Sequence, residues 1–195
     1  MDVDTFLRDR LSRRCFLRTA GIGFAGGSGV FLTACGDDDK TGIAESGLEA
    51  DRVNVEILNG ALDLELMSIE AYKKGAGKLR GSPLRIVKGF LEQEGEHVDV
   101  LENAIRDADG APNRPKSSYD FPTMRSQRDV LRFAADLENT AVAAYIDALP
   151  KLTTGDLRAT AAAILTGDAE HMAVLRGELG VEPVPDAFVN GQAPR

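Results

Sequence analysis

The 195-residue chain has no tryptophan, only two cysteines and two histidines, and aromatic residues make up 6% of it. Basic residues are also few: 23 lysines and arginines face 31 aspartates and glutamates, which gives a formal net charge of −8. A protein that binds nucleic acid needs a basic face for the phosphates, so no nucleic-acid partner is expected. The apolar content of 43% can support a core, and the length fits one domain with appended segments.

The chain also lacks an uninterrupted apolar run of the ~20 residues that a transmembrane helix needs. Its N-terminal stretch RRCFLRTAGIGFAGGSGVFLTAC starts basic, is diluted by glycine and ends in small residues. That layout is typical of an export signal, which we predict for residues 1–35. Within it, SRRCFL with Arg13 and Arg14 is similar to a twin-arginine export motif. LTAC, ending at Cys35, is similar to a lipoprotein cleavage box.

These motifs predict an exported, extracytoplasmic lipoprotein that uses the twin-arginine export machinery and is anchored to the membrane through lipid on Cys35. The other cysteine, Cys15, would be removed with the signal, so no cysteine is left in the mature domain for a disulfide. Its stability must then come from packing. The polar residues 36–50 predict a flexible tether, and residues 181–195 a C-terminal tail.

Between about residues 51 and 180, apolar residues recur with helical spacing and predict one all-α domain. Ser82, which precedes a proline, and Ser126, which precedes Asp129 by three positions, are typical of helix starts. Gly180, followed by prolines, is typical of a helix end. The predicted helices cover about residues 51–77, 83–109, 127–149 and 155–179.

The lengths of the connections predict how these helices pair. The first and third loops are short, so each of the two pairs is antiparallel. The segment between the second and third helices has about 16 residues and reaches roughly 50 Å when extended, whereas a helix of this size is ~39 Å long. The sequence therefore predicts an antiparallel four-helix bundle with a long crossover between its second and third helices.

Each predicted helix has an apolar inner stripe that is interrupted by polar residues at its middle. The interrupting residues are Glu65, Glu94, His97, Glu138, Asp168 and His171. They form an internal repeat, because Glu65 and Tyr72 recur 73 positions later as Glu138 and Tyr145, and Glu94 and His97 recur 74 positions later as Asp168 and His171. All six polar residues are therefore expected at one level of the bundle.

Four carboxylates at one level of an apolar core would be costly unless cations lie among them or protons neutralise them. Two histidines carry at most two protons, whereas two divalent metal ions would balance four carboxylates and use both imidazoles. A carboxylate and a histidine three positions apart share one face of a helix and can bind one metal ion together. A protonated, purely structural hydrogen-bond network is the alternative.

The pattern resembles the ferritin-like di-metal carboxylate bundles, which take one glutamate from each of two helices and Glu-x-x-His from each of the other two. Glu65 and Glu138 match the single glutamates, EGEH matches Glu-x-x-His, and Tyr72 matches a tyrosine often seen near such sites. Tyr72 and its repeat counterpart Tyr145 could donate hydrogen bonds or electrons there. Exported bacterial ferritin-like domain proteins, some described as desiccation-related, have a similar layout. One departure is Asp168, which stands where the family has glutamate.

The resemblance implies two Fe ions, or Fe with Mn, bound by these six residues, and oxidation of Fe(II) or reduction of O2 or peroxide. A metal-binding or stress-related bundle without turnover stays open, as does a homodimer. Because aspartate is one methylene shorter than glutamate, Asp168 predicts a weaker metal position near His171. The small residues Ala161, Ala162 and Ala163 would let the last helix approach more closely.

Overall fold

The structure of the protein, a computed structural model, describes the backbone of residues 40–192 and the side chains of residues 47–192. This part of the chain contains four α-helices and no strand, which confirms the predicted all-α class. The predicted export signal, with Arg13, Arg14 and Cys35, lies outside the described residues. The helices are α3 (Lys40–Ala76), α4 (Gly81–Asp107), α5 (Gln127–Ala148) and α6 (Gly155–Glu178).

The start of α3 differs from the prediction. The helix begins at Lys40, so residues 40–50, which were expected in a flexible tether, continue it. The segment is polar, but it contains no proline, and Glu49 pairs with Arg52 at 2.6 Å across one turn. Residues 47–49 are exposed, Leu48 at 71%, so the polar sequence indicated where α3 leaves the core but not where the helix begins.

The helix ends follow local signals to different degrees. Ser126 caps α5 and forms a reciprocal capping box with Asp129, as predicted. Thr154 caps α6 by accepting from the backbone N–H of Leu157 at 3.2 Å. The predicted cap Ser82 is wrong: it lies inside α4, whose preceding residue makes no side-chain cap, and its hydroxyl donates to Glu178 on α6 at 3.1 Å.

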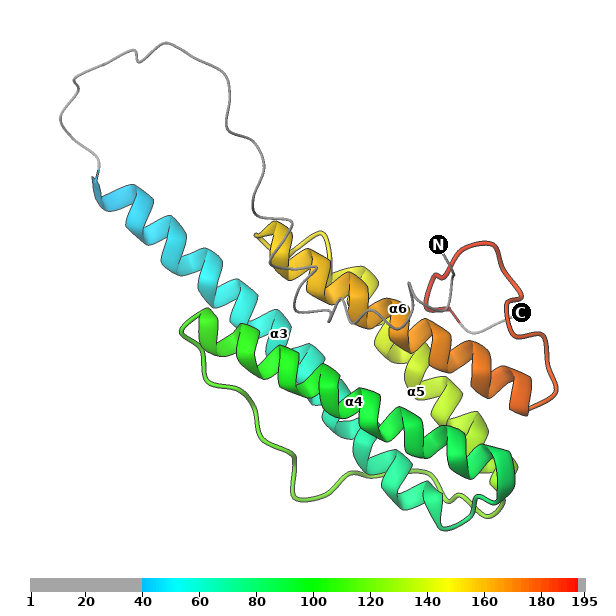
Figure 1. Cartoon of the computed structure of the whole chain (residues 1–195). Coiled ribbons are helices and arrows are strands. Elements are labelled where there is room, and N and C mark those ends of the chain that lie inside the picture. The colour runs from blue at the N-terminus through cyan, green and yellow to red at the C-terminus, as the bar shows by residue number, and fades with distance from the viewer. Residues whose placement is uncertain (1–39, 193–195) are drawn as a thin grey trace, which may run out of the picture. The chain divides into compact units, whose positions relative to one another are not determined.

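Two helical hairpins, α3 with α4 and α5 with α6, pack against each other through α3 and α5 (Figure 1). The predicted crossover runs from α4 back along the bundle to α5 (Figure 1). It is fastened to α3, because Asn59 donates to the carbonyl of Ala111 at 3.1 Å and accepts from the backbone N–H of Asn113 at 2.7 Å. The crossover therefore covers part of the bundle and leaves its interior to the four helices.

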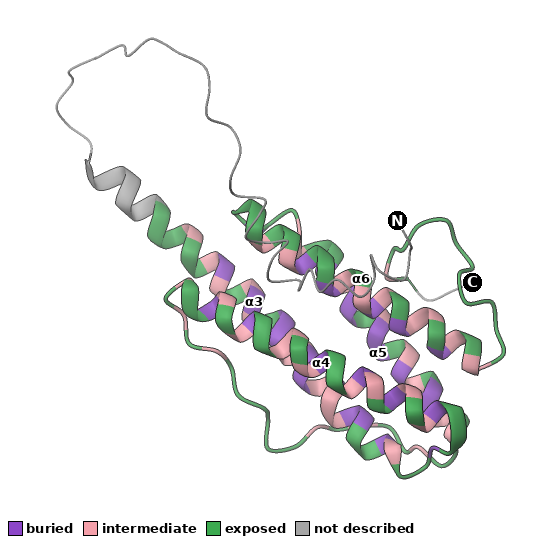
Figure 2. Cartoon of the chain, viewed as in Figure 1, coloured by how far each residue is buried: buried purple, intermediate pink, exposed green. Residues whose placement is uncertain are grey.

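Buried residues line the inner faces of the helices (Figure 2). They form two apolar clusters, one around Leu62, Leu101 and Ile164, the other around Val87 and Leu175. In α4, α5 and α6 the buried acidic residues fall between the parts of the helix that contribute to each cluster, and in α3 Glu65 lies beside Leu66, the last residue that this helix contributes to the first cluster. The two clusters therefore enclose the polar layer along the bundle axis.

The C-terminal segment after α6 is not helical, but it is fixed to α5 at one point. The side chain of Asn139 donates to the carbonyl of Gly191 at 3.0 Å. Gly191 has φ +66°, and a Cβ atom there would lie 2.4 Å from Ala143. Glycine is thus required both by the backbone conformation and by the close approach to α5.

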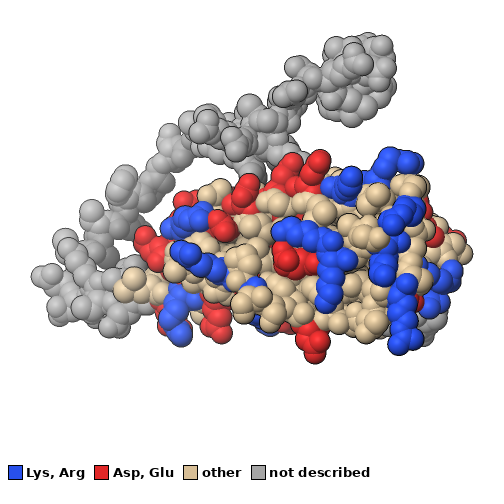
Figure 3. Space-filling model, turned by 90° about the horizontal axis from the view of Figure 1, so that it is seen from below, with Lys and Arg blue, Asp and Glu red and all other residues tan. Residues whose placement is uncertain are grey.

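The outer surface carries basic and acidic side chains interspersed on the face seen in Figure 3. Among the described residues, Lys73 pairs with Glu70 within α3 at 2.7 Å, and Lys151, which follows α5, pairs with Asp147 at 2.5 Å. None of the described helices combines the length and the apolar character that crossing a bilayer would require.

Candidate metal centre

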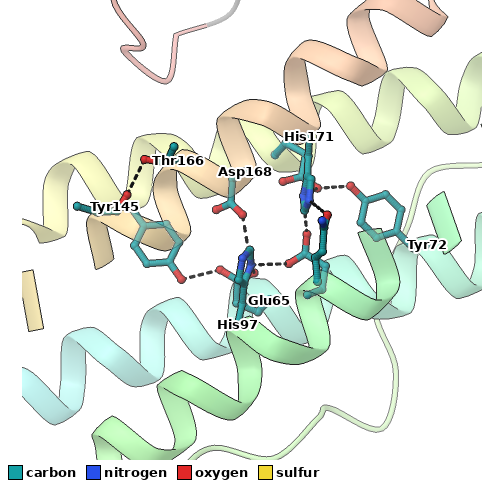
Figure 4. Close-up of polar contacts among 11 residues, drawn as sticks. Glu65, Tyr72, His97, Tyr145, Thr166, Asp168 and His171 are labelled. Atoms are coloured by element: carbon teal, nitrogen blue, oxygen red, sulfur yellow. Dashed lines mark hydrogen bonds and ion pairs between the residues drawn. The ribbon is translucent and has the colours of Figure 1, made fainter. Parts of the chain in front are cut away.

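The structure brings all six candidate residues together in the middle of the bundle (Figure 4). Every helix contributes at least one of them, because each inner stripe places its polar residues at the same level. Their side chains are almost completely buried: His97 is 12% exposed and His171 4%, and the carboxylates are at most 1% exposed. The residues are Glu65 on α3, Glu94 and His97 on α4, Glu138 on α5, and Asp168 and His171 on α6.

The six residues form two overlapping groups, each able to offer four ligand atoms within 4.8 Å of one another. We call the group that contains His97 the first position and the group that contains His171 the second position. Glu65 belongs to the first position only and Glu138 to the second only, whereas Glu94 and Asp168 belong to both. Two shared carboxylates are the arrangement that bridging of two metal ions requires.

Glu94 shows this bridging placement atom by atom. Its Oε2 lies 3.3 Å from Nδ1 of His97, and its Oε1 lies 3.1 Å from Nδ1 of His171. The first contact follows from the three-residue spacing on α4, and the second crosses to α6. One carboxylate therefore faces both histidines, with a different oxygen toward each.

Two tyrosines hold the unshared glutamates across the bundle. Tyr72 on α3 donates to Oε1 of Glu138 on α5, and Tyr145 on α5 donates to Oε1 of Glu65 on α3 at 2.6 Å. The two bonds are related by the internal repeat, and Figure 4 shows the tyrosines on opposite sides of the cluster. Both tyrosines are buried, so the bonds fix the carboxylates in an apolar environment.

Four buried atoms of the cluster have no hydrogen-bond partner: Oε1 of Glu94, Oδ1 and Oδ2 of Asp168, and Nδ1 of His171. Glu94 Oε1 and His171 Nδ1 are 3.1 Å apart, but they lack the alignment that a hydrogen bond needs. A buried polar atom without a partner costs about 1–3 kcal/mol. The four atoms belong to three side chains of the second position, Glu94, Asp168 and His171, which could bind a cation together once they are deprotonated.

Burial and mutual interaction perturb the titration of the whole cluster. Burial, reinforced by the neighbouring carboxylates, raises the pKa of Asp168 to about 10. Burial also raises the pKa of Glu65 to about 8 and that of Glu138 above its ordinary value. For Glu94, burial acts to raise the pKa, but the close approach of the His171 and His97 rings outweighs it and lowers the pKa well below its usual range.

For the histidines, burial and the neighbouring carboxylates shift the pKa in opposite directions. Burial acts to lower the pKa of both rings, but the surrounding carboxylates outweigh it and raise the pKa of His97 to about 10 and that of His171 to about 9. At neutral pH the metal-free protein therefore keeps protons on both histidines, on Asp168 and on Glu65. A metal ion that binds these residues must displace those protons.

Asp168 leans toward the first position. Its Oδ1 lies 3.5 Å from Nδ1 of His97, and no ion pair within 4.0 Å joins it to His171 among the described residues. The shorter side chain is not compensated by three alanines as expected. Ala161 is buried at 2% exposure, but Ala162 and Ala163 are exposed, so only one of the three alanines faces the packed interior.

Three residues near the histidines were missed in the sequence. Gln93 accepts from Nε2 of His171 at 2.7 Å, and Phe90 stacks on the same ring with centroids 3.9 Å apart. Gly167 lies beside His97, where a Cβ atom would be 3.2 Å from Nε2. A signal for two of them was present, because Gln93 and Gly167 are 74 positions apart and directly precede the two repeated carboxylates.

The chain belongs to the ferritin-like domain family, whose pattern matches residues 53–181, well over half of the chain. A search of curated proteins finds no match. The fold is similar to that of a conserved hypothetical protein from Mycobacterium tuberculosis, at 22% identity and a TM-score of 0.64 over 71% of this chain and 99% of that one. It is also similar to ferritin-like, diiron-carboxylate proteins from Bacillus anthracis, at 19% identity and a TM-score of 0.58. That match covers 67% of this chain and 97% of the other.

Proposed function

We propose that this protein binds two metal ions, both iron or one iron and one manganese, between the two hairpins and uses them in redox chemistry. The unpartnered atoms of Glu94, Asp168 and His171 carry the proposal. They face one another in a buried space, where the cluster needs positive charge, supplied by protons in the metal-free protein or by metal ions that displace those protons. The similarity to solved diiron-carboxylate proteins of the same fold supports the choice of metal.

The residues fit the proposed ions in charge and in chemistry. Four carboxylates carry four negative charges when ionised, which two divalent ions balance without involving the neutral imidazoles. A donor set of mostly oxygen atoms with two nitrogen atoms suits Fe and Mn. Glu94 and Asp168 would bridge the ions, Glu65 and His97 would complete the first position, and Glu138 and His171 the second.

Iron ions bound here would exchange electrons with O2 or peroxide, with Fe(II) itself as the substrate class that we favour. The chain contributes the conditions for that chemistry. Tyr72 and Tyr145 hold the two unshared glutamates through hydrogen bonds, and the two apolar clusters exclude bulk water from above and below. Oxygen and peroxide are small enough to enter where His97 is 12% exposed.

A purely structural hydrogen-bond network would use the same residues differently. Protonated carboxyl groups in such a network would donate to neighbouring acceptors and leave few atoms without a partner. Both oxygens of Asp168 lack a partner, which favours metal binding over the network. Oxygen consumption distinguishes the remaining alternative, a metal-binding protein without turnover.

The test is elemental analysis of the full chain purified from a native expression host, followed by anaerobic Fe(II) titration and then exposure to oxygen. We expect two Fe(II) bound per chain and oxygen uptake in proportion to the bound iron. Glu94→Gln should lose both results, and Glu96→Gln, an exposed position on the same helix, should keep them. Metal binding without oxygen uptake would leave only a binding function, and absence of bound metal would refute the proposal.

We also propose that the chain is exported as a folded unit and attached to a membrane by lipid. The motifs at Arg13, Arg14 and Cys35 support this, and they lie outside the described residues. Twin-arginine export after folding would let iron bind before zinc and copper compete for the site. Replacing both arginines with lysine should retain the protein in the cytoplasm, and Cys35→Ala should release it from the membrane fraction. Normal export or unchanged fractionation would refute the respective part.

A further inference from the structure

The two histidines occupy equivalent positions in the internal repeat, but their outer ring nitrogens have different neighbours. Both rings direct Nδ1 toward the carboxylates, so Nε2 faces outward in each. Nε2 of His171 is bonded to Oε1 of Gln93 at 2.7 Å, whereas no described residue makes a hydrogen bond to Nε2 of His97. The difference therefore lies in what surrounds each ring and not in the direction of the ring itself.

The sequence repeat explains where this difference comes from. Gln93 directly precedes Glu94 on α4, and its counterpart Gly167 directly precedes Asp168 on α6. Gln93 reaches across to the histidine of α6. Gly167 lies against the histidine of α4, but it has no side chain to reach with, and its missing Cβ position is 3.2 Å from Nε2 of His97.

A second pair of equivalent positions differs in the same way. Phe90 on α4 stacks on His171 with ring planes 29° apart, and its repeat counterpart on α6 is Ile164, which has no aromatic ring. His171 is consequently held by a stacked ring and a hydrogen bond and is 4% exposed. His97 has no hydrogen bond to a described residue at its outer nitrogen, the described aromatic ring nearest to it is that of His171 at 6.2 Å between centroids, and it is 12% exposed.

The hydrogen bond to Gln93 determines which nitrogen of His171 carries the proton. The amide Oε1 accepts, so Nε2 must carry a hydrogen, and a neutral ring then has its lone pair on Nδ1, which faces the cluster. A metal ligand that donates its outer N–H to a fixed acceptor is held in the correct tautomer and orientation, and losing such an acceptor typically costs 10–100-fold in metal affinity.

We propose that Gln93 is a positioning residue that fixes His171 as an Nδ1 ligand, and that Gly167 leaves the outer nitrogen of His97 open to water. The two metal positions are then built differently: the second is held rigidly, and the first exchanges protons and solutes with solvent. This inference rests on the proposed metal-binding function, and it concerns the histidine surroundings that the repeat does not preserve.

The test measures hydrogen exchange at the two Nε2–H groups by nitrogen-15 NMR, in the zinc-loaded full chain and in the metal-free chain. We expect slow exchange at His171 and exchange faster by about fivefold to tenfold at His97, which is the effect of one hydrogen bond. In the zinc-loaded chain, both Nδ1 atoms should show the shift of a metal-bound nitrogen. Equal exchange at both rings would overturn the inference.

Variants separate the two halves of the inference. Gln93→Leu should accelerate exchange at His171 alone and weaken one of two zinc affinities about 10–100-fold, whereas Gln93→Glu, which keeps an acceptor oxygen, should preserve slow exchange. Glu92→Leu, at the exposed position one residue earlier, is the control for an added apolar side chain. If Gln93→Leu leaves exchange at His171 unchanged, Gln93 is not a positioning residue.

For the other histidine, Gly167→Ala adds a methyl group whose carbon would lie 3.2 Å from Nε2 of His97. It should slow exchange at His97 and leave exchange at His171 unchanged. Gly60→Ala, where a Cβ would have nothing within 4 Å, is the matched control for a helical glycine. Unchanged exchange at His97 in Gly167→Ala would show that the glycine does not expose the ring. Failure to bind zinc would refute the proposed function, while the exchange contrast in the metal-free chain still decides this inference.

Discussion

In the hairpin of α3 and α4, Tyr72 follows Glu65 by seven positions, and in the hairpin of α5 and α6, Tyr145 follows Glu138 by the same number. Each tyrosine donates to the glutamate of the other hairpin, so α3 and α5 repeat each other in sequence and in contact. Helices α4 and α6 repeat the ligands, with aspartate replacing glutamate at 168, and some apolar residues such as Leu101 and Leu175, but they do not repeat Gln93 or Phe90. The tyrosine–glutamate contacts between the hairpins are therefore duplicated, whereas the residues around the two histidines differ.

This comparison suggests how a duplicated hairpin can hold two unlike metal ions. Interactions that connect the two hairpins, such as the tyrosine–glutamate bonds, are symmetric because each hairpin supplies one partner. Residues between α4 and α6, such as Gln93 and Gly167, can differ without changing the tyrosine–glutamate hydrogen bonds.

The largest effect on metal affinity is expected at Glu94, the carboxylate that lies next to both histidines. Glu94→Ala removes an oxygen from the neighbourhood of each histidine, so it should lower the affinity for both metal ions by at least about 100-fold. Isothermal titration with Fe(II) under anaerobic conditions measures this. Glu96→Ala, on the exposed side of α4, should have no effect. If Glu94→Ala keeps one ion at normal affinity, the carboxylate is not shared.

Asp168 tests whether the shorter side chain makes the positions unequal. The wild type should show two different affinities, with Asp168→Ala abolishing the weaker and Asp168→Glu, which restores the repeat, strengthening it. We expect the second position to be the weaker, because Asp168 lies 3.5 Å from His97 and has no ion pair with His171. Two equal affinities that Asp168→Ala leaves unchanged would remove Asp168 from the ligands.

The histidines make the metal-free protein less stable at high pH. Their folded pKa values of about 10 for His97 and about 9 for His171 exceed the unfolded value of about 6.5, so their contribution is complete below pH ~6.5 and is lost as the pH rises through 9 and 10. Glu65 and Asp168, also raised, act in the same direction from pH ~4 upward.

Urea unfolding of chelator-treated protein should therefore give a free energy of unfolding that falls steadily from pH 6.5 to pH 10. Metal binding at pH 7 should release at least the two protons carried by the histidines, which titration in buffers of different ionisation enthalpy detects. His97→Gln should flatten the upper part of the stability profile more than the lower part. A profile independent of pH would contradict the folded pKa values.

The smallest effects concern the symmetric pair. Tyr72→Phe and Tyr145→Phe each remove one buried hydrogen bond and should each cost about 1–2 kcal/mol of unfolding free energy, by similar amounts. Tyr119→Phe, whose hydroxyl accepts only an exposed backbone N–H at 3.3 Å, is the control and should cost ~0.5 kcal/mol or less. Clearly unequal effects at Tyr72 and Tyr145 would break the symmetry assigned to α3 and α5.

The fold was predictable because its signals are local and periodic. Helical spacing located α4, α5 and α6 to within two residues, and the long second connection predicted the crossover. The start of α3 was not predictable, because the first residues of this helix are polar and form no apolar stripe that would indicate a helix. Ser82 failed as a cap because its hydroxyl bonds to Glu178 on another helix, which no local pattern reveals.

The candidate site was predictable for a related reason. Buried carboxylates and histidines interrupt apolar stripes, so Glu65 and its five partners could be found as exceptions to a rule. Gln93 is exposed and Gly167 has no side chain, so neither interrupts a stripe. Their roles depend on which helix lies opposite, and only the packed bundle defines that.

The central claim is that two metal ions lie between the hairpins, and anomalous diffraction at the iron absorption edge tests it most directly. Crystals grown from iron-loaded protein should show two anomalous peaks within the polar layer, both contacting Glu94 and Asp168, one next to His97 and one next to His171. Crystals of Glu94→Gln prepared identically should lack them. A single peak, peaks only at the surface, or none at all in the wild type would contradict the account.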